Sequence, residues 1–172
     1  MSISVLDLFK IGVGPSSSHT VGPMRAAHDF VVELQRRGLL DQVRRIEAKL
    51  YGSLSATGIG HGTDRAVVAG LMGARPDEVD PDFLVGAVDA VRIDGELPLA
   101  GKTTVPFDWA RDLRLLPVSL PYHPNAMRLV AHGDAGVLDE NTYYSVGGGF
   151  VVDEAQARSG ARTEAEVAVP HP

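Results

Sequence analysis

The chain has 172 residues, of which 44% are hydrophobic and 22% charged, which is typical of a soluble globular protein with one domain, or one domain with an appendage. Its net charge of −6 and its scattered Lys and Arg residues argue against a nucleic-acid partner, and the lack of cysteine excludes disulfides, thiolate metal ligands and thiol nucleophiles from this chain. Since it has no basic-then-apolar leader and no apolar run of about 18 residues, we expect a cytoplasmic protein without a membrane span.

Helices are predicted mainly in the first half of the chain, where apolar residues recur at helical spacing. The predicted helices are residues 4–10, 21–37, 63–71 and 82–92. Between them, residues 43–50 alternate apolar and charged side chains, as a half-buried strand does.

Strands are predicted mainly in the second half, at residues 103–107, 113–116, 126–131, 137–138 and 143–152. Turn residues at 132–136 predict a hairpin, and the glycines at 147–149 interrupt the last strand. Residues 153–172 are rich in Ala, Glu and Arg, which we interpret as a tail or linker. Hairpin strands mixed with helices predict an α+β fold, a mixed sheet flanked by helices, rather than strictly alternating α/β.

The glycine-dense segment TGIGHGTD, residues 57–64, is the first candidate for a binding loop. Glycines let a ligand approach the main chain, and the helix that follows offers free backbone N–H groups. His61 lies between two glycines and therefore projects into a cleft or lies on the surface. The alternative is a tight strand-to-helix connection in which Thr63 only caps the helix.

The segment GPSSSHTVGPM, residues 14–24, has a similar character. Serine hydroxyls beside a helix N-terminus suit a carboxylate or a phosphate, and His19 can act as acid or base near neutral pH. The alternatives are a capped loop with an exposed histidine, or a flexible linker.

Two later loops also combine small polar groups with turn residues. Asn125 follows His-Pro, and Ser145 precedes a run of glycines. Each is also explained by a turn or a bulged edge strand. If these loops converge with the first two, they suit a small anionic, hydroxyl-bearing molecule. His61 and Asp64 have no evident third ligand, so we expect no metal site in this chain.

Four long motifs resemble the β region of bacterial iron–sulfur L-serine dehydratases: ISVLDLFKIGVGPSSSHTVGPM, YGSLSATGIGHGTDRAVVAGLMG, HPNAM and YYSVGGGFVVDE. The resemblance implies a dehydratase β domain over residues 1–154 and, over residues 155–172, a linker towards an absent cysteine-bearing α domain. It also implies a fold similar to the allosteric substrate-binding domain of some phosphoglycerate dehydrogenases.

In this family, L-serine loses water and becomes pyruvate and ammonia, with a [4Fe-4S] cluster acting as Lewis acid on the leaving hydroxyl. The resemblance implies cluster ligands outside this chain, and as partners the α region, L-serine and a possible second copy. A fragment without the cluster would be inactive alone. The alternative is a regulatory domain that binds serine or a related anion without chemistry; a nucleotide-binding domain ranks last, because no P-loop Lys precedes Thr63.

The resemblance also carries roles to individual residues. His61 is the first candidate for proton handling and His19 the second. The implied substrate-binding residues are Ser16, Ser17, Ser18, Thr20, Gly60, Gly62, Thr63, Asp64, Asn125, Ser145, Gly147 and Gly148.

Overall fold

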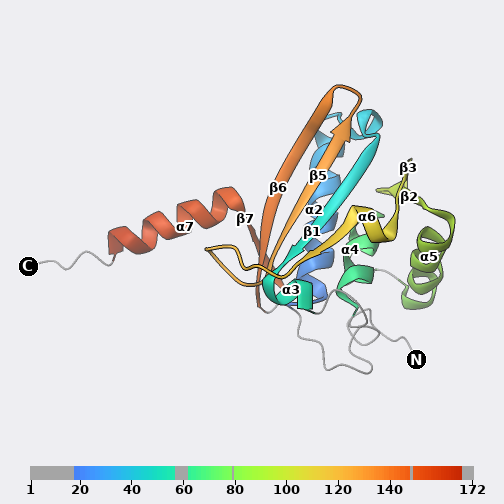
Figure 1. Ribbon diagram of the computed structural model, residues 1–172. Helices are drawn as coiled ribbons and strands as arrows, with labels where there is room; N and C mark the ends of the chain where they lie inside the picture. The colour runs from blue at the N-terminus through green and yellow to red at the C-terminus, as the bar shows by residue number, and fades with distance from the viewer. Residues whose placement is uncertain (1–17, 57–61, 79, 148, 168–172) are drawn as a thin grey trace, which may run out of the picture.

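A mixed five-stranded sheet forms the centre of the molecule (Figure 1). The computed structural model describes residues 18–56, 62–78, 80–147 and 149–167. The strands lie in the order β4-β1-β5-β6-β7, in which β4 runs parallel to β1 and the other neighbouring pairs are antiparallel. Their bounds are β1 (Arg45–Tyr51), β4 (Leu113–Leu116), β5 (Ala126–Gly133), β6 (Gly136–Gly147) and β7 (Phe150–Asp153).

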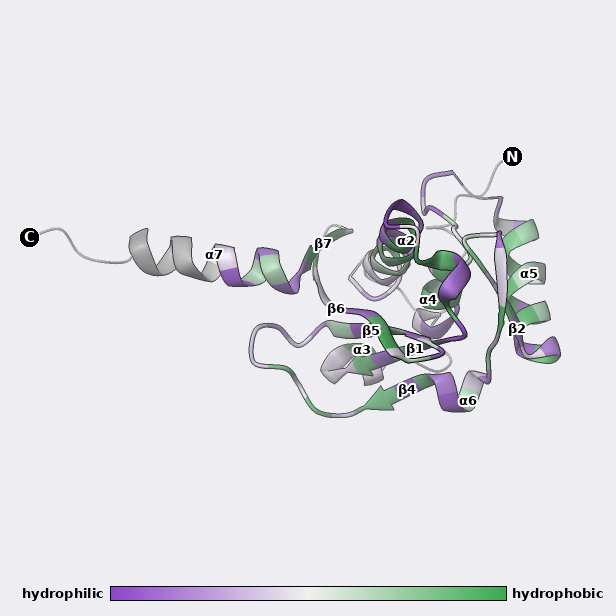
Figure 2. Ribbon diagram, turned by 90° about the horizontal axis from the view of Figure 1, so that it is seen from above, coloured by the Kyte–Doolittle hydropathy of each residue, from purple (hydrophilic) through white to green (hydrophobic). Residues whose placement is uncertain are grey.

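Two helices, α2 (Val21–Arg36) and α4 (Thr63–Leu71), lie on the same side of this sheet, as the view from above shows (Figure 2). The two helices meet at Gly70, where a methyl group would lie only 2.7 Å from Ala27 Cβ. Their close contact therefore depends on the absence of a side chain at this position.

The remaining elements extend the molecule on two sides (Figure 1). Helix α5 packs against α4 and against a separate two-stranded hairpin of β2 and β3, whereas α7 projects away from the sheet on the opposite side. The bounds are η1 (Leu40–Gln42), α3 (Gly52–Ala56), α5 (Pro81–Asp94), β2 (Glu96–Leu99), β3 (Thr103–Pro106), α6 (Trp109–Asp112) and α7 (Glu154–Val167).

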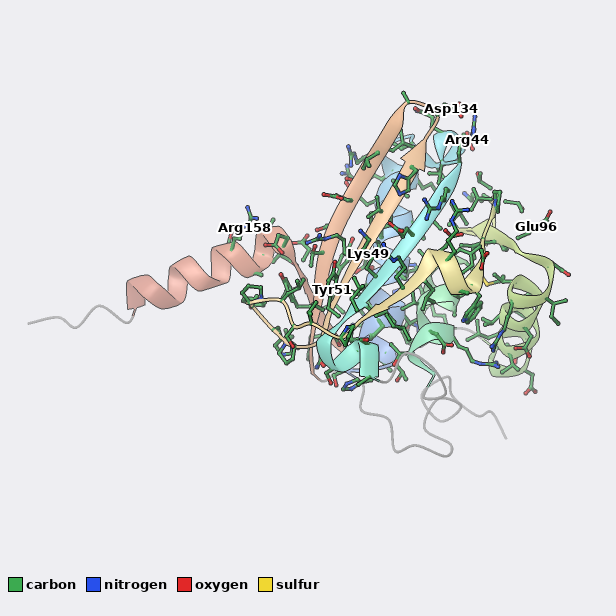
Figure 3. The ribbon with its side chains drawn as sticks, viewed as in Figure 1. Arg44, Lys49, Tyr51, Glu96, Asp134 and Arg158 are labelled. Carbon is green, nitrogen blue, oxygen red and sulfur yellow. The ribbon has the colours of Figure 1, made fainter. Side chains whose placement is uncertain are left out.

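The alternating side chains of β1 show how the two faces of the sheet differ. Ile46, Ala48 and Leu50 are fully buried in the main core, which they share with α2 and α4. Lys49 and Tyr51 lie on the opposite face, which these helices do not cover (Figure 3). Within the described residues, no helix has the length and apolar character needed to cross a membrane.

The predicted α+β class, with a mixed sheet flanked by helices, is confirmed. The helices predicted at 21–37, 63–71 and 82–92 correspond to α2, α4 and α5, and the predicted strand at 43–50 to β1. The hairpin predicted around residues 132–136 joins β5 to β6. The helix predicted at 4–10 lies outside the described residues, and the likeness to the phosphoglycerate dehydrogenase domain stays a prediction.

The structure refines two predictions about the end of the chain. Residues 143–152 do not form one strand, because Gly147 and Gly149 have positive φ values of 102° and 78° and turn the chain back from β6 into β7. Much of the expected tail is helix α7. Asp153 and Gln156 exchange side-chain hydrogen bonds with each other's backbone N–H, 2.9 and 2.8 Å long, and this reciprocal cap starts the helix.

Candidate functional site

The loops that precede α2 and α4 come together at one end of the molecule. The hydroxyl of Thr63 donates a hydrogen bond of 2.7 Å to the backbone oxygen of His19. Gly62, with a φ of 90°, occupies the position before the first residue of α4. Thr63 therefore does more than begin a helix, because its hydroxyl is bound to the backbone of His19 in the candidate loop before α2.

The His19 side chain lies between two serine hydroxyls. Its Nδ1 atom is 3.0 Å from Ser18 Oγ, and its Nε2 atom is 2.8 Å from Ser53 Oγ. Burial lowers the pKa of His19 below its ordinary value. Since a hydroxyl can donate or accept, this pair of contacts suits a neutral imidazole, which has one N–H and one free lone pair. His19 is thus available as a proton acceptor near neutral pH.

Ser53 is a member of this group that the sequence analysis missed. Its backbone N–H donates to Pro124 O over 3.0 Å, so it joins the His19 loop to the loop before Asn125. The signal in the sequence is the preceding Gly52, directly after an alternating strand. Gly52 has a φ of 52°, and a methyl group there would lie 2.6 Å from Pro124 O, so only glycine allows these loops to approach.

Asn125 and Ser145 form a second polar pair at the ends of β5 and β6. The Ser145 backbone N–H donates to Asn125 O over 2.9 Å, and Asn125 Nδ2 donates to Ser145 O over 3.3 Å. In the part of the chain that the structure describes, the buried atoms Asn125 Oδ1 and Ser145 Oγ have no hydrogen-bond partner. His132 Nε2 on β5 is a third such atom, but only Asn125 Oδ1 and Ser145 Oγ belong to neighbouring candidate residues, where a ligand or water can satisfy both.

The turn between β6 and β7, which follows Ser145, lies against the start of α2. A methyl group on Gly149 would lie 3.1 Å from Val21 Cγ1, the first residue of the helix. Gly147, a predicted site residue, belongs to the same turn. These contacts connect the start of α2, the start of α4, the end of β1 and the β6–β7 hairpin, the elements that carry the described candidate residues.

Thr20 and Asp64, two further predicted residues, are buried. Thr20 precedes α2 without a side-chain cap, and its backbone oxygen accepts from Met24 N. The Asp64 carboxylate accepts from Arg65 N over 2.8 Å and from the side chain of Trp109, and burial raises its pKa. These hydrogen bonds direct the carboxylate towards α6. Its role in substrate binding stays a prediction.

Several predicted residues lie outside the described part of the chain. They are Ser16, Ser17, Gly60, His61 and Gly148. Whether His61 or His19 handles the proton therefore remains a question for experiment.

The residues of this chain do not fit the role of iron–sulfur ligands. The sequence has no cysteine, and the described residues contain no group of three or more His, Asp or Glu side chains that could hold a metal ion.

Comparison with known proteins places the chain in a family. The family model for the serine dehydratase beta chain matches residues 4–156. The chain is 46% identical over 173 residues to the L-serine dehydratase of Mycobacterium tuberculosis, 46% over 171 residues to L-serine dehydratase 1 of Escherichia coli, and 50% over 156 residues to the L-serine dehydratase of Streptomyces coelicolor.

These matches cover 99%, 99% and 90% of this chain, but only 37%, 37% and 34% of the respective relatives. The chain therefore spans little more than a third of the length of the proteins it resembles. With nearly all of its own length matched, it belongs to the serine dehydratase beta-chain family.

Proposed function

We propose that this chain is the substrate-binding part of an L-serine dehydratase, which converts L-serine to pyruvate and ammonia by loss of water. The family and the names of the relatives support this activity. We further propose that a [4Fe-4S] cluster is held by cysteines of an α region outside this chain, because no residue described here fits that role.

The observation that carries the proposal is the pair of unpartnered buried atoms, Asn125 Oδ1 and Ser145 Oγ. The carbonyl oxygen of Asn125 accepts hydrogen bonds only, so it suits the ammonium group of L-serine. The Ser145 hydroxyl suits the carboxylate, to which it would donate. A substrate that satisfies both atoms removes their desolvation penalty and is thereby oriented.

His19 is proposed to act beside these two residues. Elimination of water requires loss of the weakly acidic α-proton of serine, and a neutral imidazole is a suitable acceptor. The hydroxyls of Ser18 and Ser53 fix the plane of the ring. His61 remains the first candidate for the same proton, in which case His19 would bind and orient the substrate.

Replacing Asn125 with alanine in the complete dehydratase tests the proposal. The substrate ammonium would lose a buried partner, and we expect kcat/KM for L-serine to fall by at least about tenfold. The control is Asn141→Ala, on β6 away from the site, which should retain near-normal kcat/KM. Equal values for both variants would show that Asn125 does not bind the substrate.

A regulatory role is the second candidate, because the unpartnered atoms of Asn125 and Ser145 would serve binding without chemistry equally well. Calorimetric titration of the chain with L-serine, alone and with the cysteine-bearing region, separates the two functions. Binding that requires the cysteine-bearing region supports a shared catalytic site. Full-strength binding to the chain alone, without any effect of the Asn125 substitution on turnover, supports regulation.

A further inference from the structure

An open cavity of about 760 Å³ lies beside α6. Its wall is formed by the C-terminal end of α5, the segment that follows β3, the residues of α6 and the start of β1. Figure 1 shows α5 and α6 on the side of the molecule opposite α7. Its size is in the range of small-molecule sites, and none of the predicted substrate-binding residues lines it.

The cavity contains four arginines, two of which already have acidic partners. Arg45 donates to Asp112 Oδ1 over 2.8 Å. Arg44 forms an ion pair of 3.3 Å with Asp134, at the tip of the β5–β6 hairpin (Figure 3). Arg92 and Arg111 form no ion pair with another described residue within the cavity, so their charges are available to a ligand.

Two of the three acidic residues in the cavity are engaged in local structure. Asp108 accepts from the backbone N–H groups of Ala110 and Arg111 at the start of α6. Asp112 accepts from Arg45 and, through its other oxygen, from Asp108 N over 2.8 Å. Asp94 and the charge of the neighbouring Asp64 oppose Arg92, but the lining as a whole has four arginines and three aspartates and is therefore net positive although the chain is acidic.

An aromatic surface adjoins these charges. The guanidinium of Arg92 lies 5.4 Å from the centre of the Trp109 ring, and Phe107 meets the same ring edge-on with 6.3 Å between centres. Ile93, which also lines the cavity, is 82% exposed. The half-buried Trp109 and the exposed Ile93 thus lie beside arginines that have no carboxylate ion pair, an arrangement that suits anions carrying an apolar group.

We propose that this cavity binds a small organic anion, with its carboxylate or phosphate on Arg92 and Arg111 and its flat or apolar group against Trp109 and Ile93. Arginine suits both kinds of anion, because its planar fork matches their oxygens. The ligand would be distinct from the L-serine of the proposed function, because it would occupy a separate cavity and use an aromatic surface.

Trp109 is the only tryptophan of the chain and therefore reports on the cavity directly. Phenyl phosphate and benzoate serve as probes of the two anion classes, inorganic phosphate as the anion without an apolar group, and phenol as the ring without a charge. Titration at low salt should give a saturable change of Trp109 fluorescence with at least one aryl anion. Phenol and inorganic phosphate should each bind at least about tenfold more weakly.

Charge-removing variants give the decisive comparison. Arg92→Gln and Arg111→Gln should each weaken binding of that aryl anion at least about tenfold, as measured by calorimetry. The control is Arg75→Gln, an arginine outside the cavity that pairs with Glu78, and it should bind with unchanged affinity. No saturable binding up to about 10 mM, or equal affinities in all three variants, would overturn the proposal.

Discussion

At the residue scale, removing the hydroxyl of Ser145 distinguishes an effect on substrate binding from an effect on the stability of the fold. It is buried without a partner among the described residues, so the folded protein gains nothing from it in the absence of ligand. Ser145→Ala should therefore leave the free energy of unfolding unchanged or raise it by about 1 kcal/mol, while kcat/KM of the complete dehydratase falls. Urea unfolding and steady-state kinetics on the same variant measure both effects.

The matched control is Thr142→Ala on the same strand. Thr142 is equally buried, but its hydroxyl accepts a hydrogen bond of 3.0 Å from Arg128 Nε. Its loss should lower the free energy of unfolding by about 1 kcal/mol or more without lowering kcat/KM. A Ser145→Ala protein that is destabilised and fully active would contradict the binding role.

The lowered pKa of His19 predicts a pH dependence of stability. Burial lowers the folded-state pKa below the unfolded value of about 6.5, so the unfolded chain binds more protons as the pH falls through this value. Stability should therefore decrease from pH 6.5 downwards until the pH passes the folded-state pKa, and it should not change above neutrality on account of this group.

Unfolding curves of the wild type and of His19→Gln between about pH 5 and pH 8 isolate this contribution, because the other five histidines are common to both. The difference between the two free energies should move in favour of the variant at low pH. A difference that is constant over the whole range would show that His19 has no depressed pKa.

The site could be predicted from sequence where small polar residues adjoin glycine or proline. His19, Thr63, Asn125 and Ser145 were predicted in this way, and their role in a site stays a prediction; the structure shows that Thr63 contacts His19 and that Asn125 contacts Ser145. Ser53 was missed, since a serine after a strand has no signature of its own and gains its place only through the Gly52 contact with Pro124. The direction of the Asp64 carboxylate depends on Trp109, which is distant in sequence.

At the element scale, the contact between α2 and α4 depends on Gly70. A methyl group at this position would overlap the backbone oxygen of Met24 and lie 2.7 Å from Ala27 Cβ. Gly70→Ala should therefore force the helices apart and lower the free energy of unfolding by about 1–3 kcal/mol, measured in urea.

Gly86, in helix α5, is the natural comparison, because no atom lies within 4 Å of a methyl group built there. Gly86→Ala should raise the free energy of unfolding by about 0.5–1 kcal/mol, since alanine favours the helix. If both substitutions stabilise the protein, the close helix contact does not exist in solution.

The sequence of helix α7 contains a helix-capping signal, but its polar composition led us to interpret this stretch as a tail. Residues 153–156 read Asp-Glu-Ala-Gln, a sequence able to form the reciprocal cap that the structure contains, and they precede good helix formers. Ala157 then packs with Tyr51 and Tyr144 on the face of the sheet opposite α2 and α4. Few apolar residues follow, and this is why the stretch resembled a tail.

At the scale of the whole molecule, most helices and strands could be predicted from the sequence, but the order in which the strands pair in the sheet could not. Strands with clear alternation, such as β1 and β5, were located because one face is buried and the other is polar. The short strand β2 and the single-turn helix α6 were not predicted, because four residues are too few to show a repeating pattern of apolar side chains. The pairing of β4 with β1 joins residues that are far apart in the sequence. A local sequence pattern therefore cannot predict it.

This strand order has a consequence for the folding pathway. The neighbours β5, β6 and β7 are also consecutive in the chain, whereas β4 reaches β1 only after α3, α4, α5 and the β2–β3 hairpin. Local pairings close small loops and form early, while the parallel pair must close a long one. We therefore expect a transition state in which the β5–β7 meander is formed and β4 is still detached.

Leu129→Ala in β5 and Leu113→Ala in β4 test this order, since both side chains are buried in the same core. Stopped-flow kinetics should show slower folding for Leu129→Ala and mainly faster unfolding for Leu113→Ala. If both substitutions change the folding rate and the unfolding rate in the same proportion, the expected order of folding is contradicted. Asn125 directly precedes this meander and Ser145 lies within it, whereas Ser53 follows β1. The Asn125–Ser145 pair would therefore form early in folding, and Ser53 would join it later.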